Sequence, residues 1–270
     1  MYARISIAAF RALLVAGFVV VKSALVAQTG SVEGDLFVFT VALLVALFVF
    51  IEYASDMPSM LEFRYAPPYN RMRFLIAVVI AFALCSDTYS QNLFYAEGFN
   101  ATTGNSFVGI FSIWPAPGHY LYTVLDYANQ DPVYWLFDNV ALASMLGFAC
   151  VLVAGIYIWI SPWPLGREGF NLWPNMPSFN PASGRSASDL LAVVALANII
   201  LFFVLPYCLT FLISLAQQDL GFDFRYTPVF TFWVLFTWIT LPLFCLFKAI
   251  ALLKLCVLAE SLRKLESGTE

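Results

Sequence analysis

Six stretches of the chain are each long enough and apolar enough to cross a lipid bilayer. A helix needs about 20 mostly apolar residues to span the hydrocarbon core, since each residue advances it by about 1.5 Å. We predict transmembrane helices in six windows, at approximately 5–27, 35–53, 74–95, 133–160, 190–214 and 229–253. These windows predict an all-α integral membrane protein, a six-transmembrane-helix bundle that forms a single domain over residues 1–270.

The composition supports lipid as the solvent of much of the surface. Hydrophobic residues make up 61% of the chain and charged residues 11%, whereas about 25% of the residues in a soluble domain are charged. We therefore expect the lipid bilayer as a partner and a multi-pass membrane location, with the bacterial inner membrane as the expected compartment. The net charge of −4 and the lack of a long basic run argue against nucleic acid as a partner.

The positions of the basic residues predict the orientation. Cytoplasmic segments of membrane proteins carry an excess of lysine and arginine. The segment 96–132 contains neither residue type, and the segment 215–228 has only Arg225. Most of the remaining lysines and arginines lie near the start of the chain, in the second and fourth connecting segments, and at the end of the chain: Arg4, Arg11, Arg64, Arg71, Arg73, Arg167, Arg185, Lys254, Arg263 and Lys264. This alternation predicts that both the N- and the C-terminus are cytoplasmic.

The third connecting segment, 96–132, is expected to form a cap on the outer side. Its apolar run 107–114 is too short to span a membrane, and residues 115–118 contain two prolines and a glycine. From Gly118 to Asn129 apolar residues recur at helical spacing, which predicts an amphipathic helix at the outer interface. A gating lid is the alternative interpretation of this loop.

Two inner segments carry local signals for helices. Residues 59–62 have the pattern of a capping box, which predicts a short helix that Pro67 and Pro68 would end. After the last window, four leucines recur at helical spacing: Leu255, Leu258, Leu262 and Leu265. This spacing predicts a cytoplasmic extension of the last helix that packs on its own protein.

The candidate site is a group of polar residues inside the predicted spans. Counting along the helices places Lys22 and Asp138 roughly 8 Å, and Asp87 roughly 10 Å, below the outer edge of the membrane. Asn139 could complete a polar network with them. Charge at this depth is costly, so a coupling-ion or proton site is one hypothesis. The favoured alternative is a structural pair between Lys22 and one or both aspartates, which would lock helix packing.

Most enzyme classes lack the residues that they require. The chain has one histidine, His119, and its five cysteines lie in apolar runs without a CxxC pair. Haem ligation by paired histidines, a di-iron site and a zinc-protease motif are therefore excluded. Neither a Walker pattern nor a GxGxxG pattern occurs. We predict no catalytic residue, no cofactor and no metal ligand.

Three classes of function remain, of which an intramembrane enzyme is the least favoured. The first is a non-catalytic membrane protein, a structural, accessory or assembly subunit that packs with other membrane subunits. The second is a small ion- or proton-coupled transporter or channel that uses Lys22, Asp87 and Asp138. They differ in one structural property, because a transporter needs a polar cavity that reaches these side chains, whereas an accessory subunit can be packed solidly around them.

Overall fold

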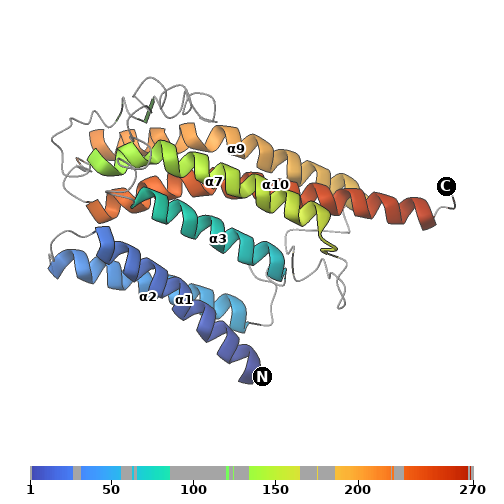
Figure 1. The fold of residues 1–270 in the computed structure, drawn as a ribbon, viewed down its shortest axis with the longest axis horizontal. Coiled ribbons are helices and arrows are strands. Elements are labelled where there is room, and N and C mark those ends of the chain that lie inside the picture. The colour runs from blue at the N-terminus through green and yellow to red at the C-terminus, as the bar shows by residue number, and fades with distance from the viewer. Residues whose placement is uncertain are drawn as a thin grey trace, which may run out of the picture. The chain divides into compact units, whose positions relative to one another are not determined.

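The regular structure in the described part of the chain is entirely helical. The computed structural model describes residues 2–26, 32–55, 63, 66–85, 120–121, 124, 134–164, 175, 186–219, 221, 228–266 and 268. Its helices there are α1 (Tyr2–Val26), α2 (Val32–Ala54), α3 (Pro67–Leu84), α7 (Tyr134–Ile160), α9 (Ala187–Gln218) and α10 (Pro228–Glu266) (Figure 1). This confirms an all-α protein.

Four of these helices contain segments long and apolar enough to cross a membrane: Ile5–Ala24, Asn139–Ile160, Ala187–Gln218 and Pro228–Lys264. The segment Val38–Ala54 of α2 is also apolar but shorter. The chain is therefore of membrane type, whereas the number of six spans and the cytoplasmic position of both termini remain predictions.

The start of α3 corrects one expectation. Pro67 and Pro68 begin α3, seven residues before the predicted window at 74. Proline is favoured at the first position of a helix, because its missing N–H would have no partner there and its fixed φ suits the helix. The capping-box residues 59–62 and the predicted span beyond Cys85 lie outside the described residues.

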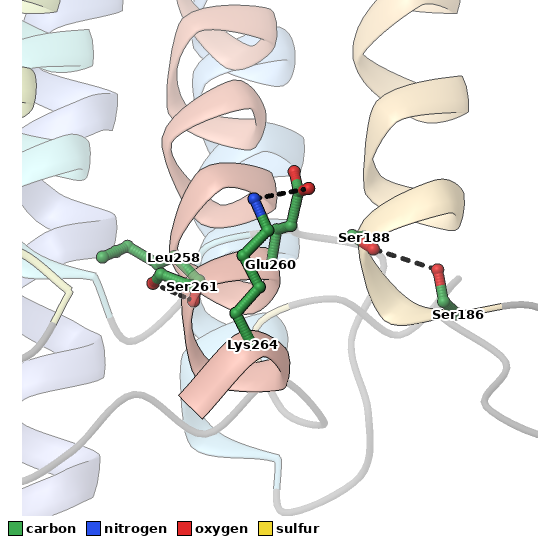
Figure 2. Close-up of polar contacts among 6 residues, drawn as sticks. All are labelled: Ser186, Ser188, Leu258, Glu260, Ser261 and Lys264. Carbon is green, nitrogen blue, oxygen red and sulfur yellow. Dashed lines mark hydrogen bonds and ion pairs between the residues drawn. The ribbon is translucent and has the colours of Figure 1, made fainter. Parts of the chain in front are cut away.

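The last two helices are longer than their apolar windows. Ser186 caps α9, since its hydroxyl accepts a hydrogen bond of 3.2 Å from the backbone N–H of Asp189. Figure 2 shows Ser186 and Ser188 at this helix start, with their hydroxyls 2.9 Å apart. α10 continues unbroken through Leu258 to Glu266, so the predicted helical extension after residue 253 is present.

The chain divides into two compact units, which are described separately. The first unit comprises residues 1–70 and 164–183. Within it α1 packs against α2, and the small residues Ala8, Ala12 and Ala42 are buried. Small side chains let two helices approach closely in a membrane. The guanidinium of Arg11 lies 4.3 Å from the ring centroid of Tyr53 and adds a cation–π contact.

In the first unit, a buried hydrogen bond joins the segment that follows α2 to the segment that follows α7. The backbone N–H of Phe63 donates to the carbonyl oxygen of Asn175 at 2.6 Å, and the Asn70 side chain donates to the Phe63 carbonyl at 2.7 Å. Phe63 has a φ of 60° and packs against Tyr69, with ring centroids 4.6 Å apart and ring planes tilted by 37°. A positive φ is rare for an aromatic residue, so packing and hydrogen bonds must hold it there.

The second unit, residues 71–163 and 184–270, contains α7, α9, α10 and most of α3. Its helices run lengthwise beside one another (Figure 1). Its interior is apolar and rich in large side chains: Trp238, Phe232, Phe247, Ile76, Ile80 and Leu84 are all buried. The prediction of one transmembrane domain over residues 1–270 remains untested.

Contacts between helices define their directions in the second unit. Gly147 of α7 lies next to Leu243 of α10, and Gly155 next to Ile250, so α7 and α10 are parallel. Leu84 of α3 meets Asn139, and Ile80 meets Gly147, so α3 is antiparallel to α7. α9 is antiparallel to α10, because Thr210 contacts Trp238 whereas Ser188 contacts Cys256. The helices therefore alternate in direction along the chain.

Candidate functional site

The structure describes the predicted polar network only in part. Lys22 lies on α1 in the first unit and is 1% exposed. Asp87 lies outside the described residues, and so does the side chain of Asp138, whose backbone belongs to α7. Asn139 is buried in the second unit. The network of Lys22, Asp87, Asp138 and Asn139 therefore remains a prediction.

Asn139 serves as a cap for a neighbouring helix. Its Nδ2 donates to the carbonyl oxygen of Leu84, the last residue of α3, at 3.3 Å. The final carbonyls of a helix have no partner within it, and in a buried setting this is costly. The N–H of Cys85 adds bonds to Ala81 at 3.2 Å and Phe82 at 3.1 Å. Asn139 of α7 thus supplies a hydrogen-bond donor to the last carbonyl of α3.

The ammonium group of Lys254 caps the C-terminal end of α7. This group lies 2.7 Å from the carbonyl oxygen of Ile158, 3.3 Å from that of Trp159 and 2.6 Å from that of Ser161. α7 ends at Ile160, so these acceptors surround its C-terminus. A cation is favoured there, because the helix dipole is negative at this end and an ammonium has three donors. Lys254 is 9% exposed.

A third buried polar contact joins α9 to α10. The indole N–H of Trp238 lies 3.1 Å from the carbonyl oxygen of Pro206 and 3.0 Å from the hydroxyl of Thr210. The Thr210 hydroxyl in turn donates to the Pro206 carbonyl at 2.8 Å. All three residues are buried. The Pro206 carbonyl of α9 thus accepts hydrogen bonds from a side chain of its own helix and from one of α10.

Other buried polar side chains of the second unit bond within their own helices. Asn198 donates to the carbonyl of Val194 at 2.7 Å, and Thr240 to that of Phe236 at 2.7 Å. Each acceptor lies four residues earlier in the same helix. Among the residues that the structure describes, no group of three or more His, Cys, Asp or Glu side chains is placed to hold a metal ion.

Sequence reasoning found Asn139 as a polar position but missed the roles of Lys254 and Trp238. Lys254 is identified from the sequence only as one of the basic residues near the end of the chain. The carbonyls that it binds lie 93 to 96 residues earlier. Trp238 is one apolar residue among many in its window. No local pattern predicts either contact, because both depend on which helices become neighbours.

The fold and these contacts define an all-α protein of membrane type in which the C-terminal ends of α3 and α7 are capped by side chains from other helices. No protein-family model matches the sequence, and comparisons with curated proteins and with solved structures give no match.

Proposed function

We propose that this protein is a non-catalytic, multi-pass membrane protein that acts as a structural, accessory or assembly subunit of a membrane complex. One observation carries the proposal: three buried polar side chains of the second unit donate hydrogen bonds to backbone carbonyls of other helices. Asn139, Lys254 and Trp238 each hold one helix to another in this way.

Such bonds favour a static scaffold over a transport pathway. A transporter exposes polar groups to a cavity, where they exchange partners with the transported ion. All three donors of the Lys254 ammonium have carbonyl acceptors, and the Trp238 indole has two acceptors. Moving either side chain would break several bonds in a low-dielectric interior, where an unpaired polar group is costly.

The outer faces of the helices offer packing surfaces for other membrane subunits. Large apolar and aromatic side chains are exposed along α7 and α9, among them Ile156, Trp159, Phe203 and Phe211. In a membrane such faces contact lipid or another protein. Aromatic side chains give a partner helix a large and rigid contact area.

Six spans, cytoplasmic termini and a bacterial inner membrane belong to the same proposal. The alternating directions of α3, α7, α9 and α10 support a chain that crosses the membrane back and forth. The hydrogen bond between Phe63 and Asn175 joins the segments that follow α2 and α7, which supports their location on one side of the membrane. The absence of lysine and arginine from 96–132 supports the opposite side for that loop.

Purification from native membranes in mild detergent tests the proposal. We expect a tagged full-length chain to co-purify with one or more membrane proteins at a fixed stoichiometry, measured by native mass spectrometry. A tagged membrane protein of similar size from an unrelated complex is the control for non-specific capture. Recovery of the chain alone, together with ion flux in proteoliposomes, would contradict the accessory role.

The alternative function is a small ion- or proton-coupled transporter or channel. The burial of Lys22, a cation within the apolar helix α1, is the observation that favours it. Under this alternative, the variant with Lys22→Met, Asp87→Asn and Asp138→Asn folds but loses flux in proteoliposomes. Under the accessory role, Lys22→Met alone destabilises the protein and the triple variant largely recovers stability.

A further inference from the structure

The two longest described helices of the second unit each contain a buried proline. Pro206 lies inside α9 and Pro242 inside α10. Proline has no backbone N–H, so α9 lacks the hydrogen bond from position 206 to the Phe202 carbonyl. α10 likewise lacks the bond from position 242 to the Trp238 carbonyl. Each helix therefore resists bending least at its proline.

The two prolines lie opposite each other across the contact between α9 and α10. Thr210 meets Trp238 at this contact, since the indole nitrogen lies 3.0 Å from the Thr210 hydroxyl. The helices are antiparallel, so four residues back along α9 and four residues forward along α10 lead to one level. A step of four residues also keeps the same face of a helix. These steps reach Pro206 and Pro242, and the weak positions of the two helices therefore coincide.

The neighbouring helices give little support at this level. Gly147 of α7 lies next to Leu243, the residue after Pro242. Glycine is a poor helix former, so α7 also has a weak position there. Ile80 of α3 contacts the same glycine position, and α3 ends four residues later at Leu84. A proline-containing helix is braced by stiff neighbours, whereas here α7, α9 and α10 are weakened at one level.

The hydrogen bond from Trp238 to Pro206 crosses this level. Trp238 lies one turn before Pro242, in the part of α10 that a bend at Pro242 would move. Its indole N–H donates to the Pro206 carbonyl at 3.1 Å. A bend that carries Trp238 away from Pro206 breaks this bond in a buried setting, where the loss of a partner is costly. The bond therefore holds α9 and α10 in the described arrangement.

We propose that Pro206 and Pro242 form a paired hinge about which the tip of the α9–α10 hairpin bends as one body, and that the Trp238 hydrogen bonds lock this hinge. The tip comprises residues 207–218 of α9 and 228–241 of α10. Sharp kinks of more than about 20° occur mainly at proline. Leu215 lies nine residues, or about 13.5 Å, beyond Pro206, so a bend of about 20° would move it by about 5 Å.

Distances between spin labels in full-length protein in lipid nanodiscs test the hinge. The labels are attached at Leu215→Cys on the tip and at Val153→Cys on α7, beyond Gly147 and away from the tip. Both positions are exposed, and the five native cysteines are replaced by serine or alanine. We expect a narrow distance distribution with Trp238 present and a shift or broadening of up to about 5 Å in Trp238→Phe. Adding Pro206→Ala and Pro242→Ala should restore the narrow distribution.

Two controls separate a hinge from general loosening. Pro228→Ala removes the proline at the first position of α10, where no N–H is needed, and should not restore the narrow distribution of the Trp238→Phe variant. Labels at Val193→Cys and Val153→Cys lie on the same side of the hinge. Their distance distribution should stay narrow in every variant.

Four results would overturn the proposal. They are a narrow tip distribution in Trp238→Phe, a broad one that persists without the two prolines, restoration by Pro228→Ala, and equal broadening of the Val193–Val153 distance. If the variant without both prolines loses its helical circular dichroism or its monodispersity, Trp238→Phe with Pro242→Ala decides. Its tip distribution must then be narrower than that of Trp238→Phe alone, and an equally broad distribution contradicts the hinge.

Discussion

At the scale of single residues, the second unit depends on a few buried polar side chains. The Lys254 ammonium donates hydrogen bonds to three carbonyls at the end of α7. The Trp238 indole N–H donates to the Pro206 carbonyl and the Thr210 hydroxyl. The Lys254 contacts satisfy carbonyls at a helix end, which lack partners within that helix. The Trp238 contact adds a donor from a second helix to the Pro206 carbonyl. Their loss should therefore cost more than the loss of similar groups at the surface.

We expect Lys254→Met to destabilise the protein by about 2–3 kcal/mol, because it removes a charged donor from three carbonyls at the end of α7. The control is Lys264→Met on the same helix, which breaks only an exposed ion pair with Glu260 and should cost less than about 1 kcal/mol. Denaturant unfolding in mixed micelles measures both. Equal stabilities of the two variants would contradict the capping role of Lys254.

We expect Trp238→Phe to cost about 0.5–1.5 kcal/mol, since the ring is kept and the buried N–H donor is lost. Trp159→Phe is the matched control, because Trp159 is 50% exposed on α7. The same unfolding experiment compares them. A control variant as unstable as Trp238→Phe would show that ring size, and not the hydrogen bond to Pro206 and Thr210, determines the effect.

At the scale of the elements, close approach of helices depends on small residues. A Cβ added at Gly147 would lie 2.8 Å from side-chain atoms of Ile80 and of Leu243. α7 therefore fits between α3 and α10 only because this position lacks a side chain. At Gly17 of α1, by contrast, an added Cβ would meet no atom within 4 Å.

We expect Gly147→Ala to destabilise the protein by about 1–3 kcal/mol through overpacking, although alanine is the better helix former. Gly17→Ala should be neutral or stabilising by up to about 1 kcal/mol, because there the helix propensity acts alone. Thermal unfolding followed by circular dichroism measures the difference. A Gly147→Ala variant as stable as Gly17→Ala would show that Ile80 and Leu243 can move aside.

At the scale of the whole molecule, the central question is how often the chain crosses the membrane. Four helices are long and apolar enough to cross, and α2 contains a shorter apolar segment. α3 has 18 residues and begins with a polar turn that contains Arg71 and Arg73, so its described part is short for a span. The six-span proposal therefore requires that this span continue beyond Leu84.

We expect Pro115→Cys to react with a membrane-impermeant maleimide from outside, and Asn180→Cys to react only after permeabilisation. Both substitutions are made in a chain whose five native cysteines are replaced by serine or alanine. The prediction follows from the absence of basic residues in 96–132 and their presence at Arg167 and Arg185. Equal labelling of both positions in intact cells would contradict the six-span topology.

The sequence by itself determined the all-α, membrane-type character of the protein. Runs of apolar residues are local signals, and helix formation in lipid satisfies backbone groups within one segment. The tertiary structure decided which helices are neighbours and therefore what the buried polar groups bind. Asn139 reaches Leu84 55 residues away, and Lys254 reaches Ile158 96 residues away. Such contacts depend on helix direction and rotation, which a window of sequence does not contain.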